Sequence, residues 1–126
     1  MNGKQNPAPG FRRHPDHSIT VEHLGAPVTV TEGGVVLARS GHSLLLREMS
    51  YPPVIYIPFA DIDFGQLERS ATATHCPFKG DASYWRLAGH VDGADVMWAY
   101  ETPFDEMTAI RAHGAFHRDR VTLTTG

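Results

Sequence analysis

Short runs of alternating apolar and polar residues, interrupted every few positions by turn residues, constrain the fold of this chain more than any other feature. Val28 and Val30 alternate with threonines, Glu32-Gly33-Gly34 has the composition of a hairpin turn, and residues 35–40 read as the returning strand. Residues 54–57 form the clearest apolar run, which a proline ends. A period of two turns one set of side chains inward, so these runs predict β-strands.

The remainder of the chain has the same character and predicts one all-β domain. We expect a short helix from Phe104 to about Arg111, a loop over residues 70–80, and further strands over residues 19–23, 44–49, 63–69, 81–88, 96–100, 112–117 and 120–124. The leucine run in residues 44–49 also fits a short helical piece. Residues 1–17 lack an apolar period and are expected to form a flexible or draped N-terminal arm. Frequent short strands over residues 18–126 indicate a barrel, a sandwich or a tent-like pair of sheets.

Composition excludes several classes of protein. The formal net charge of -3 provides no basic field for nucleic acid and no polybasic patch for anionic lipid. Cys76 is the only cysteine, which rules out an intrachain disulfide and any zinc site built from paired cysteines. No apolar stretch is long enough for a membrane span, and the first residues lack the apolar core of a secretory signal. We therefore expect a cytoplasmic protein with no metal and no cofactor.

The segment Thr74-His75-Cys76-Pro77-Phe78-Lys79-Gly80-Asp81-Ala82-Ser83-Tyr84-Trp85 has an unusual composition and admits a catalytic interpretation. A neighbouring cation lowers the pKa of a thiol, and both His75 and Lys79 are near Cys76 in sequence. His75 would also serve as a base for a thiol nucleophile. Adjacent residues usually point apart, however, and a free cysteine is most often a small buried apolar group. Packing is therefore the competing interpretation of Cys76.

The same segment also supports ligand binding. Lys79 supplies a cation beside the small Gly80, and Asp81 supplies an acceptor. Aromatic surface comes from two later pairs of residues, Tyr84 with Trp85 and Trp98 with Tyr100. A small-molecule site needs apolar walls and a few convergent polar groups, and this set contains both. The competing interpretation is that at least two of the four aromatic residues belong to the core.

Two other pairs of residues carry weaker indications. Asp61 and Asp63 would share one face of a strand, as metal-dependent nucleotidyl transfer requires, but no glycine-rich phosphate loop precedes them. Solvated turn carboxylates explain them better. His113 and His117 are four positions apart, which on a strand separates them by roughly 13 Å. That distance is too long for one zinc ion.

Four stretches together resemble the domain-of-unknown-function 427 family, which also carries a nucleotidyltransferase-like label. They are the Thr74–Trp85 segment, Ser50-Tyr51-Pro52-Pro53-Val54-Ile55-Tyr56-Ile57-Pro58, Trp98-Ala99-Tyr100, and Phe116 to Val121. The resemblance covers roughly residues 27–124 and departs at Asp81 and Ala99, where the family often has Glu and Ser. It implies a β-tent, with two antiparallel sheets meeting at an angle. Since this chain has one cysteine, we expect a metal-free tent. The resemblance implies no activity.

Three functions therefore remain as expectations. The first is a small-molecule-binding domain with a pocket around His75–Trp85, formed by Lys79, Asp81, Tyr84 and Trp85 with Trp98 and Tyr100 nearby. The second is a thiol-dependent enzyme using Cys76 with His75 or Lys79. The third is a protein-interaction module or a homodimer.

Overall fold

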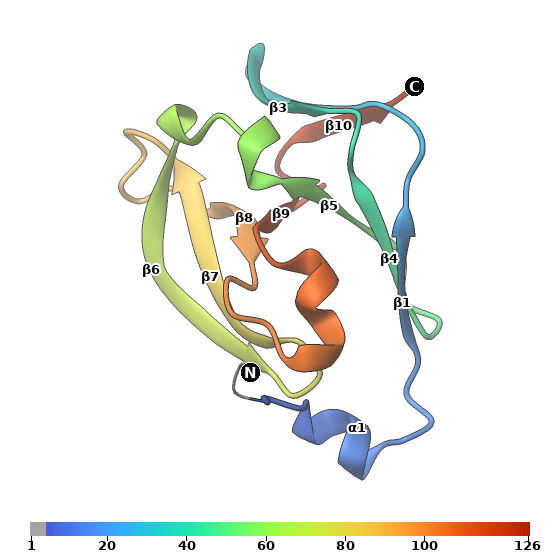
Figure 1. Cartoon of the computed structure of the whole chain (residues 1–126). Coiled ribbons are helices and arrows are strands. Elements are labelled where there is room, and N and C mark those ends of the chain that lie inside the picture. The colour runs from blue at the N-terminus through green and yellow to red at the C-terminus, as the bar shows by residue number, and fades with distance from the viewer. Residues whose placement is uncertain (1–4) are drawn as a thin grey trace.

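The computed structural model describes residues 5–126, which fold into two antiparallel β-sheets (Figure 1). A seven-stranded sheet has the order β1-β4-β5-β9-β8-β7-β6, and a three-stranded sheet has the order β10-β2-β3. The strands are β1 (Ile19–His23), β2 (Val28–Glu32), β3 (Val35–Ser40), β4 (Leu44–Glu48), β5 (Val54–Pro58), β6 (Leu67–Cys76), β7 (Gly80–Leu87), β8 (Asp95–Ala99), β9 (His113–Phe116) and β10 (Thr122–Thr125). The predicted mainly-β fold with two antiparallel sheets is confirmed.

Helical structure is limited to short pieces. They are α1 (Pro9–Arg13) and three 3₁₀ turns, η1 (Phe59–Asp61), η2 (Phe64–Gln66) and η3 (Asp105–Ile110). The predicted helix from Phe104 to about Arg111 is therefore the 3₁₀ segment η3, whose first turn carries two acidic residues. No described helix combines the length and the apolar character that crossing a membrane would require.

The seven-stranded sheet buries side chains on both of its faces. On β5, Ile55 and Ile57 enter a cluster shared with β2 and β3, whereas Tyr56 enters a second cluster that includes residues of η3. Trp85 belongs to the first cluster, and Trp98 and Tyr100 pack with the second. Burial of each large apolar side chain stabilises the fold by about 1.5–3 kcal/mol, so both clusters hold the sheet in shape.

The prediction of a loop over residues 70–80 is wrong in part. Strand β6 continues to Cys76 and pairs antiparallel with β7, with an irregularity in register between Arg69 and Ala73. β6 lies at the edge of the sheet, and most of its side chains from Ala71 to His75 are exposed. Because neither face of this stretch is buried, its side chains show no alternation of apolar and polar residues. Backbone hydrogen bonds to β7 form the strand there.

Two other sequence expectations are refined by local contacts. Residues 44–48 form strand β4 rather than a helix, since they pair with β1 on one side and β5 on the other. The strand expected from residue 63 begins only at Leu67. Before it, the Asp63 carboxylate accepts a hydrogen bond from the Gly65 amide at 3.1 Å and starts η2.

The described part of the N-terminal segment, residues 5–17, lies against the rest of the domain. The Gly10 amide donates to the Pro77 carbonyl at 2.9 Å, and the Ala8 amide donates to the Glu106 carboxylate at 2.9 Å. A Cβ added at Gly10 would lie 2.7 Å from the Phe78 ring, so only glycine fits at this contact. The other residues of the arm predicted from the sequence, 1–4, are outside the described residues.

Candidate functional site

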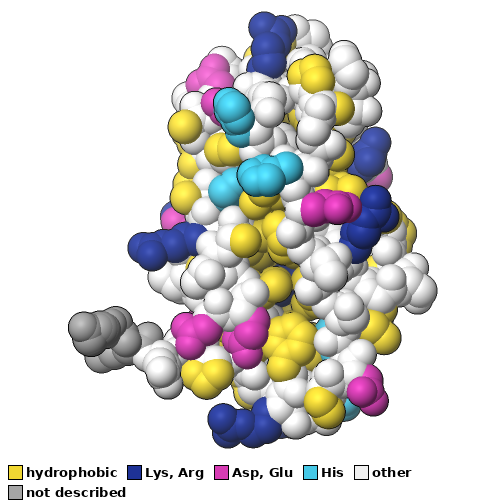
Figure 2. All heavy atoms as spheres, turned by 45° about the vertical axis from the view of Figure 1, so that its right-hand side comes forward, with side chains coloured by type: hydrophobic (Ala, Val, Ile, Leu, Met, Phe, Trp, Pro, Cys, Tyr) yellow, Lys and Arg dark blue, Asp and Glu magenta, His cyan; other side chains and the backbone are white. Residues whose placement is uncertain are grey.

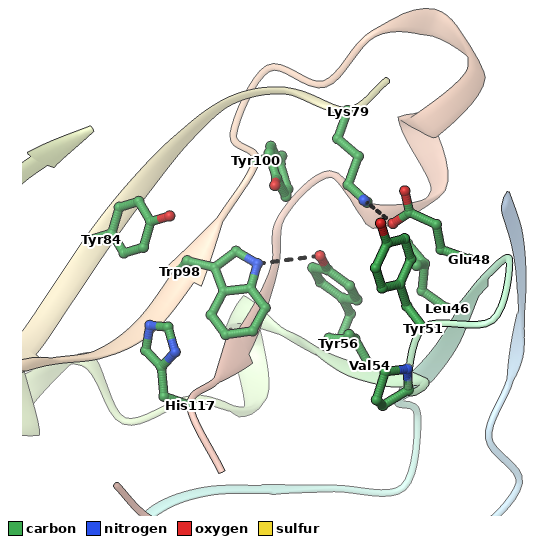
Figure 3. A pocket seen from close by; sticks show the side chains of 11 residues that line it. Leu46, Glu48, Tyr51, Val54, Tyr56, Lys79, Tyr84, Trp98, Tyr100 and His117 are labelled. Carbon is green, nitrogen blue, oxygen red and sulfur yellow. Dashed lines mark hydrogen bonds and ion pairs between the residues drawn. The ribbon is translucent and has the colours of Figure 1, made fainter. Parts of the chain in front are cut away.

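A pocket of about 280 Å³ lies between two halves of the seven-stranded sheet. One wall comes from β4, β5 and the turn between them, and the other from β7, β8 and the ends of their neighbours (Figure 3). The lining residues are Leu46, Glu48, Tyr51, Pro52, Val54, Tyr56, Lys79, Tyr84, Trp98, Tyr100 and His117. The pocket therefore has apolar walls with a few polar groups, the composition typical of small-molecule sites.

An ion pair occupies one end of the pocket. Lys79 Nζ lies 2.5 Å from Glu48 Oε1, and His17 Nε2 lies 2.7 Å from Glu48 Oε2, so each carboxylate oxygen has its own partner. Burial by itself would raise the pKa of Glu48, but the hydrogen bonds and charges of Lys79 and His17 lower it below the ordinary range. Glu48 is therefore ionised at neutral pH.

The position of Lys79 depends on the tight turn between β6 and β7. Its carbonyl accepts a hydrogen bond from the Phe104 amide at 3.0 Å, and the next residue, Gly80, has a φ of +120°. A Cβ at Gly80 would lie 3.3 Å from the Thr102 carbonyl, so both the backbone angle and the close approach favour glycine. The Phe78 ring stacks on His17 with centroids 3.9 Å apart. The turn is thus held between η3 and the N-terminal segment.

Phenol and indole groups form the centre of the pocket. The Trp98 indole N–H donates to the Tyr56 hydroxyl at 3.3 Å. Burial raises the pKa of Tyr56 and that of Tyr100 well above the ordinary value for a phenol, and neighbouring acidic groups add to both shifts. The two hydroxyls therefore keep their protons throughout the physiological pH range.

His117 closes the far end of the pocket. Its ring lies 4.7 Å from the Trp98 ring and is nearly parallel to Tyr84 at 6.3 Å. Burial, with a smaller contribution from the positive charge of Arg120, lowers the pKa of His117 below its ordinary value. The imidazole is therefore mostly neutral at pH 7.

Four of the residues predicted from sequence meet in this pocket: Lys79, Tyr84, Trp98 and Tyr100. The other four do not line it. Trp85 is buried on the opposite face of the sheet, where the Arg69 guanidinium lies 4.7 Å from its ring centroid. Strand alternation explains this separation, since Tyr84 and Trp85 are adjacent on β7.

His75, Cys76 and Asp81 lie around the turn and outside the pocket lining. His75 Nδ1 is 2.7 Å from Asp81 Oδ1, and both side chains are largely exposed. Cys76 is half-buried and packs against the cluster that contains Tyr56 and Tyr100. Among the described residues, the hydrogen bonds of His75 do not include the Cys76 thiol.

Sequence reasoning missed Glu48, His17 and several residues of the β4–β5 side. Glu48 meets Lys79 and His17 only through the fold, and nothing in the local sequence of Glu48 or His17 marks them. Tyr51 and Tyr56 had a signal, because they belong to the Ser50–Pro58 stretch. Each of the four stretches that carry the family resemblance contributes to the lining. The residues are Tyr51, Pro52, Val54 and Tyr56 from Ser50–Pro58, Lys79 and Tyr84 from Thr74–Trp85, Trp98 and Tyr100 from Trp98–Tyr100, and His117 from Phe116–Val121.

The paired carboxylates and His113 lie outside the pocket, whereas His117, the other histidine of its pair, lines it. Asp61 accepts a hydrogen bond from the Ser40 hydroxyl at 2.6 Å, and Asp63 caps η2. His113 lines a separate hollow beside β1 and β4, over which Figure 2 shows histidine side chains next to hydrophobic surface. Within residues 5–126, no set of three or more His, Cys, Asp or Glu side chains is arranged to hold a metal ion.

Comparison with protein families gives one match. The model described as Domain of unknown function (DUF427) matches residues 20–125, which include every residue that lines the pocket. Comparison with curated proteins finds no match.

Proposed function

The chain belongs to the DUF427 family, and we propose that it binds a small molecule in the pocket between the two halves of its seven-stranded sheet. One observation carries the proposal: four separate stretches of sequence, each part of the resemblance to the family, meet around this one concavity. A core needs only apolar side chains of suitable volume. The lining here includes a charged pair and four phenols as well, which favours a binding role.

The energetics of the Lys79–Glu48 pair support the same proposal. Lys79 is only 8% exposed, one of three buried polar or charged residues among those described. Buried ion pairs cost desolvation energy, and well-packed apolar residues often stabilise a protein as much or more. A lysine kept at the edge of a pocket is therefore better explained by recognition of a ligand than by stability.

A volume of about 280 Å³ limits the ligand to a small molecule. This volume lies near the lower end of the range of about 300–1,000 Å³ that is typical of ligand pockets. Cys76 does not line the pocket, so the proposed site uses no thiol. We further propose a cytoplasmic location, where the free Cys76 would stay reduced.

A thermal-shift screen of small metabolites tests the proposal, with two substituted proteins as comparison. Val54→Phe places a larger side chain in the pocket, whereas Val36→Phe places the same side chain on the exposed edge of β3. Compounds that bind in the pocket should stabilise the wild-type protein and Val36→Phe but not Val54→Phe. Hits that stabilise all three proteins equally, or a broad library without any hit, would contradict the proposal.

A further inference from the structure

The polar groups that face the pocket are mainly hydrogen-bond donors. Lys79 has three N–H groups and directs one to Glu48. The Tyr56 hydroxyl accepts from Trp98, so its own proton is left to donate. The Tyr100 hydroxyl makes no hydrogen bond to any of the described residues. Figure 3 shows the Tyr56 hydroxyl beside the Trp98 nitrogen, the Tyr100 hydroxyl turned toward Trp98, and the Lys79 ammonium directed to Glu48.

At the end of the pocket that holds Lys79, the carboxylate acceptors are already in use, and the neutral His117 ring with its acceptor nitrogen lies at the far end. Glu48 is the only acidic residue among the described residues that line the pocket, and its two oxygens are taken by Lys79 and His17. The Tyr84 hydroxyl is paired with the Thr74 hydroxyl at 2.8 Å. A ligand group that enters this space therefore meets unpaired donors, which favours a group that supplies only acceptors.

The charges distinguish an anion from a cation. Five aromatic residues line the pocket, and such a lining also suits an ammonium group. Here, however, Lys79 lies within the same space and would repel a ligand cation, while Glu48 is already neutralised. Among the described residues that line the pocket, Lys79 is the one lysine or arginine. A single cationic side chain suits one negative charge better than the two of a phosphate monoester.

We infer that the ligand is a small monocarboxylate with a flat apolar body, an inference that rests on the proposed binding function. Its carboxylate accepts hydrogen bonds from Lys79, Tyr56 and Tyr100. Its body lies against Trp98 and the apolar side chains of Leu46 and Val54. Aromatic faces favour offset stacking with another planar group, and the volume leaves room for one small ring besides the acid.

Three matched probes test the inference: benzoate, benzamide and benzylamine. They have the same ring and nearly equal size, but their polar groups are anionic, neutral and cationic, respectively. Isothermal titration should find that benzoate binds the wild-type protein at least about tenfold more tightly than either analogue, because charge-assisted hydrogen bonds are the stronger kind. Equal or tighter binding of benzamide or benzylamine at the pocket would overturn the inference and leave the proposed function standing. Absence of binding by all three would overturn the carboxylate assignment, and the wider screen would then decide the proposed function.

Removal of a single hydroxyl gives the second readout. Tyr100→Phe keeps the ring and loses only the unpaired donor, so it should fold normally and weaken benzoate by about tenfold while changing benzamide less. Ser83→Ala is the matched control, because the Ser83 hydroxyl donates to Glu101 at 2.7 Å, outside the pocket. An unchanged affinity of Tyr100→Phe for benzoate, in protein shown to be folded, would overturn the inference.

Discussion

Lys79 and Glu48 are separated by 31 positions in the sequence, yet their side chains meet at 2.5 Å at the end of the pocket. Glu48 ends β4 and Lys79 directly precedes β7, and these two strands are not neighbours in the seven-stranded sheet. The pair therefore connects the two halves of the seven-stranded sheet across the concavity. Its contribution to stability and its role in binding are separable by substitution.

The first prediction concerns the cost of removing one partner of the ion pair. Lys79→Met should lower the free energy of unfolding by about 1–3 kcal/mol, because Glu48 then remains partly buried with His17 as its remaining side-chain partner. The double substitution Lys79→Met with Glu48→Leu should recover most of that loss. Urea unfolding of the three proteins measures both effects. A double variant no more stable than the single one would contradict the account of this pair.

The second prediction concerns alkaline pH. Burial raises the pKa of Tyr56 and Tyr100, so above about pH 10 the unfolded chain loses protons that the folded chain retains. The folded state then binds more protons than the unfolded state, and stability falls as the pH rises. Tyrosinate absorbance should show that two of the four tyrosines ionise only together with unfolding. Ionisation of all four before any loss of structure would show that the pocket hydroxyls are not withdrawn from solvent.

The third prediction concerns Cys76. The thiol is half-buried, and its neighbour His75 is engaged with Asp81 instead. A thiol reagent at neutral pH should therefore label the folded protein more slowly than it labels free cysteine, and the rate should rise to that of free cysteine in denaturant. Faster labelling of the folded protein would revive the thiol-enzyme interpretation.

The fourth prediction concerns the contact between the N-terminal segment and the turn that positions Lys79. Gly10→Ala should displace residues 5–17, since the new Cβ would lie 2.9 Å from the Pro77 carbonyl as well as against Phe78. Tryptic cleavage after the exposed Arg12 and Arg13 should then become faster, because local opening exposes the chain. Gly41→Ala is the control, as open space surrounds that position. Equal cleavage rates would mean that this contact does not hold the segment.

The sequence was most informative where side chains alternate between two buried faces. In the strands predicted over residues 81–88 and 96–100, a period of two places Tyr84 and Trp85 on opposite faces and Trp98 with Tyr100 on the same face, and the structure shows both arrangements. The continuation of the edge strand β6 beyond Arg69 was missed because its exposed side chains leave no period. Glu48 and His17 were missed because the contacts of Glu48 with Lys79 and with His17 depend on how distant segments come together, information that a local pattern does not contain.

The most direct test of ligand binding in the pocket uses the two tryptophans as reporters. Trp98 lines the pocket and donates its indole N–H to Tyr56, whereas Trp85 packs in the core on the opposite face of the sheet, with Phe59 and Phe64. Titration of ¹⁵N-labelled protein with benzoate should move the indole N–H signal of Trp98 in a saturable manner and leave that of Trp85 in place. A saturable shift of the Trp85 indole signal alone, or a Trp98 signal that stays in place at every benzoate concentration, would contradict the account.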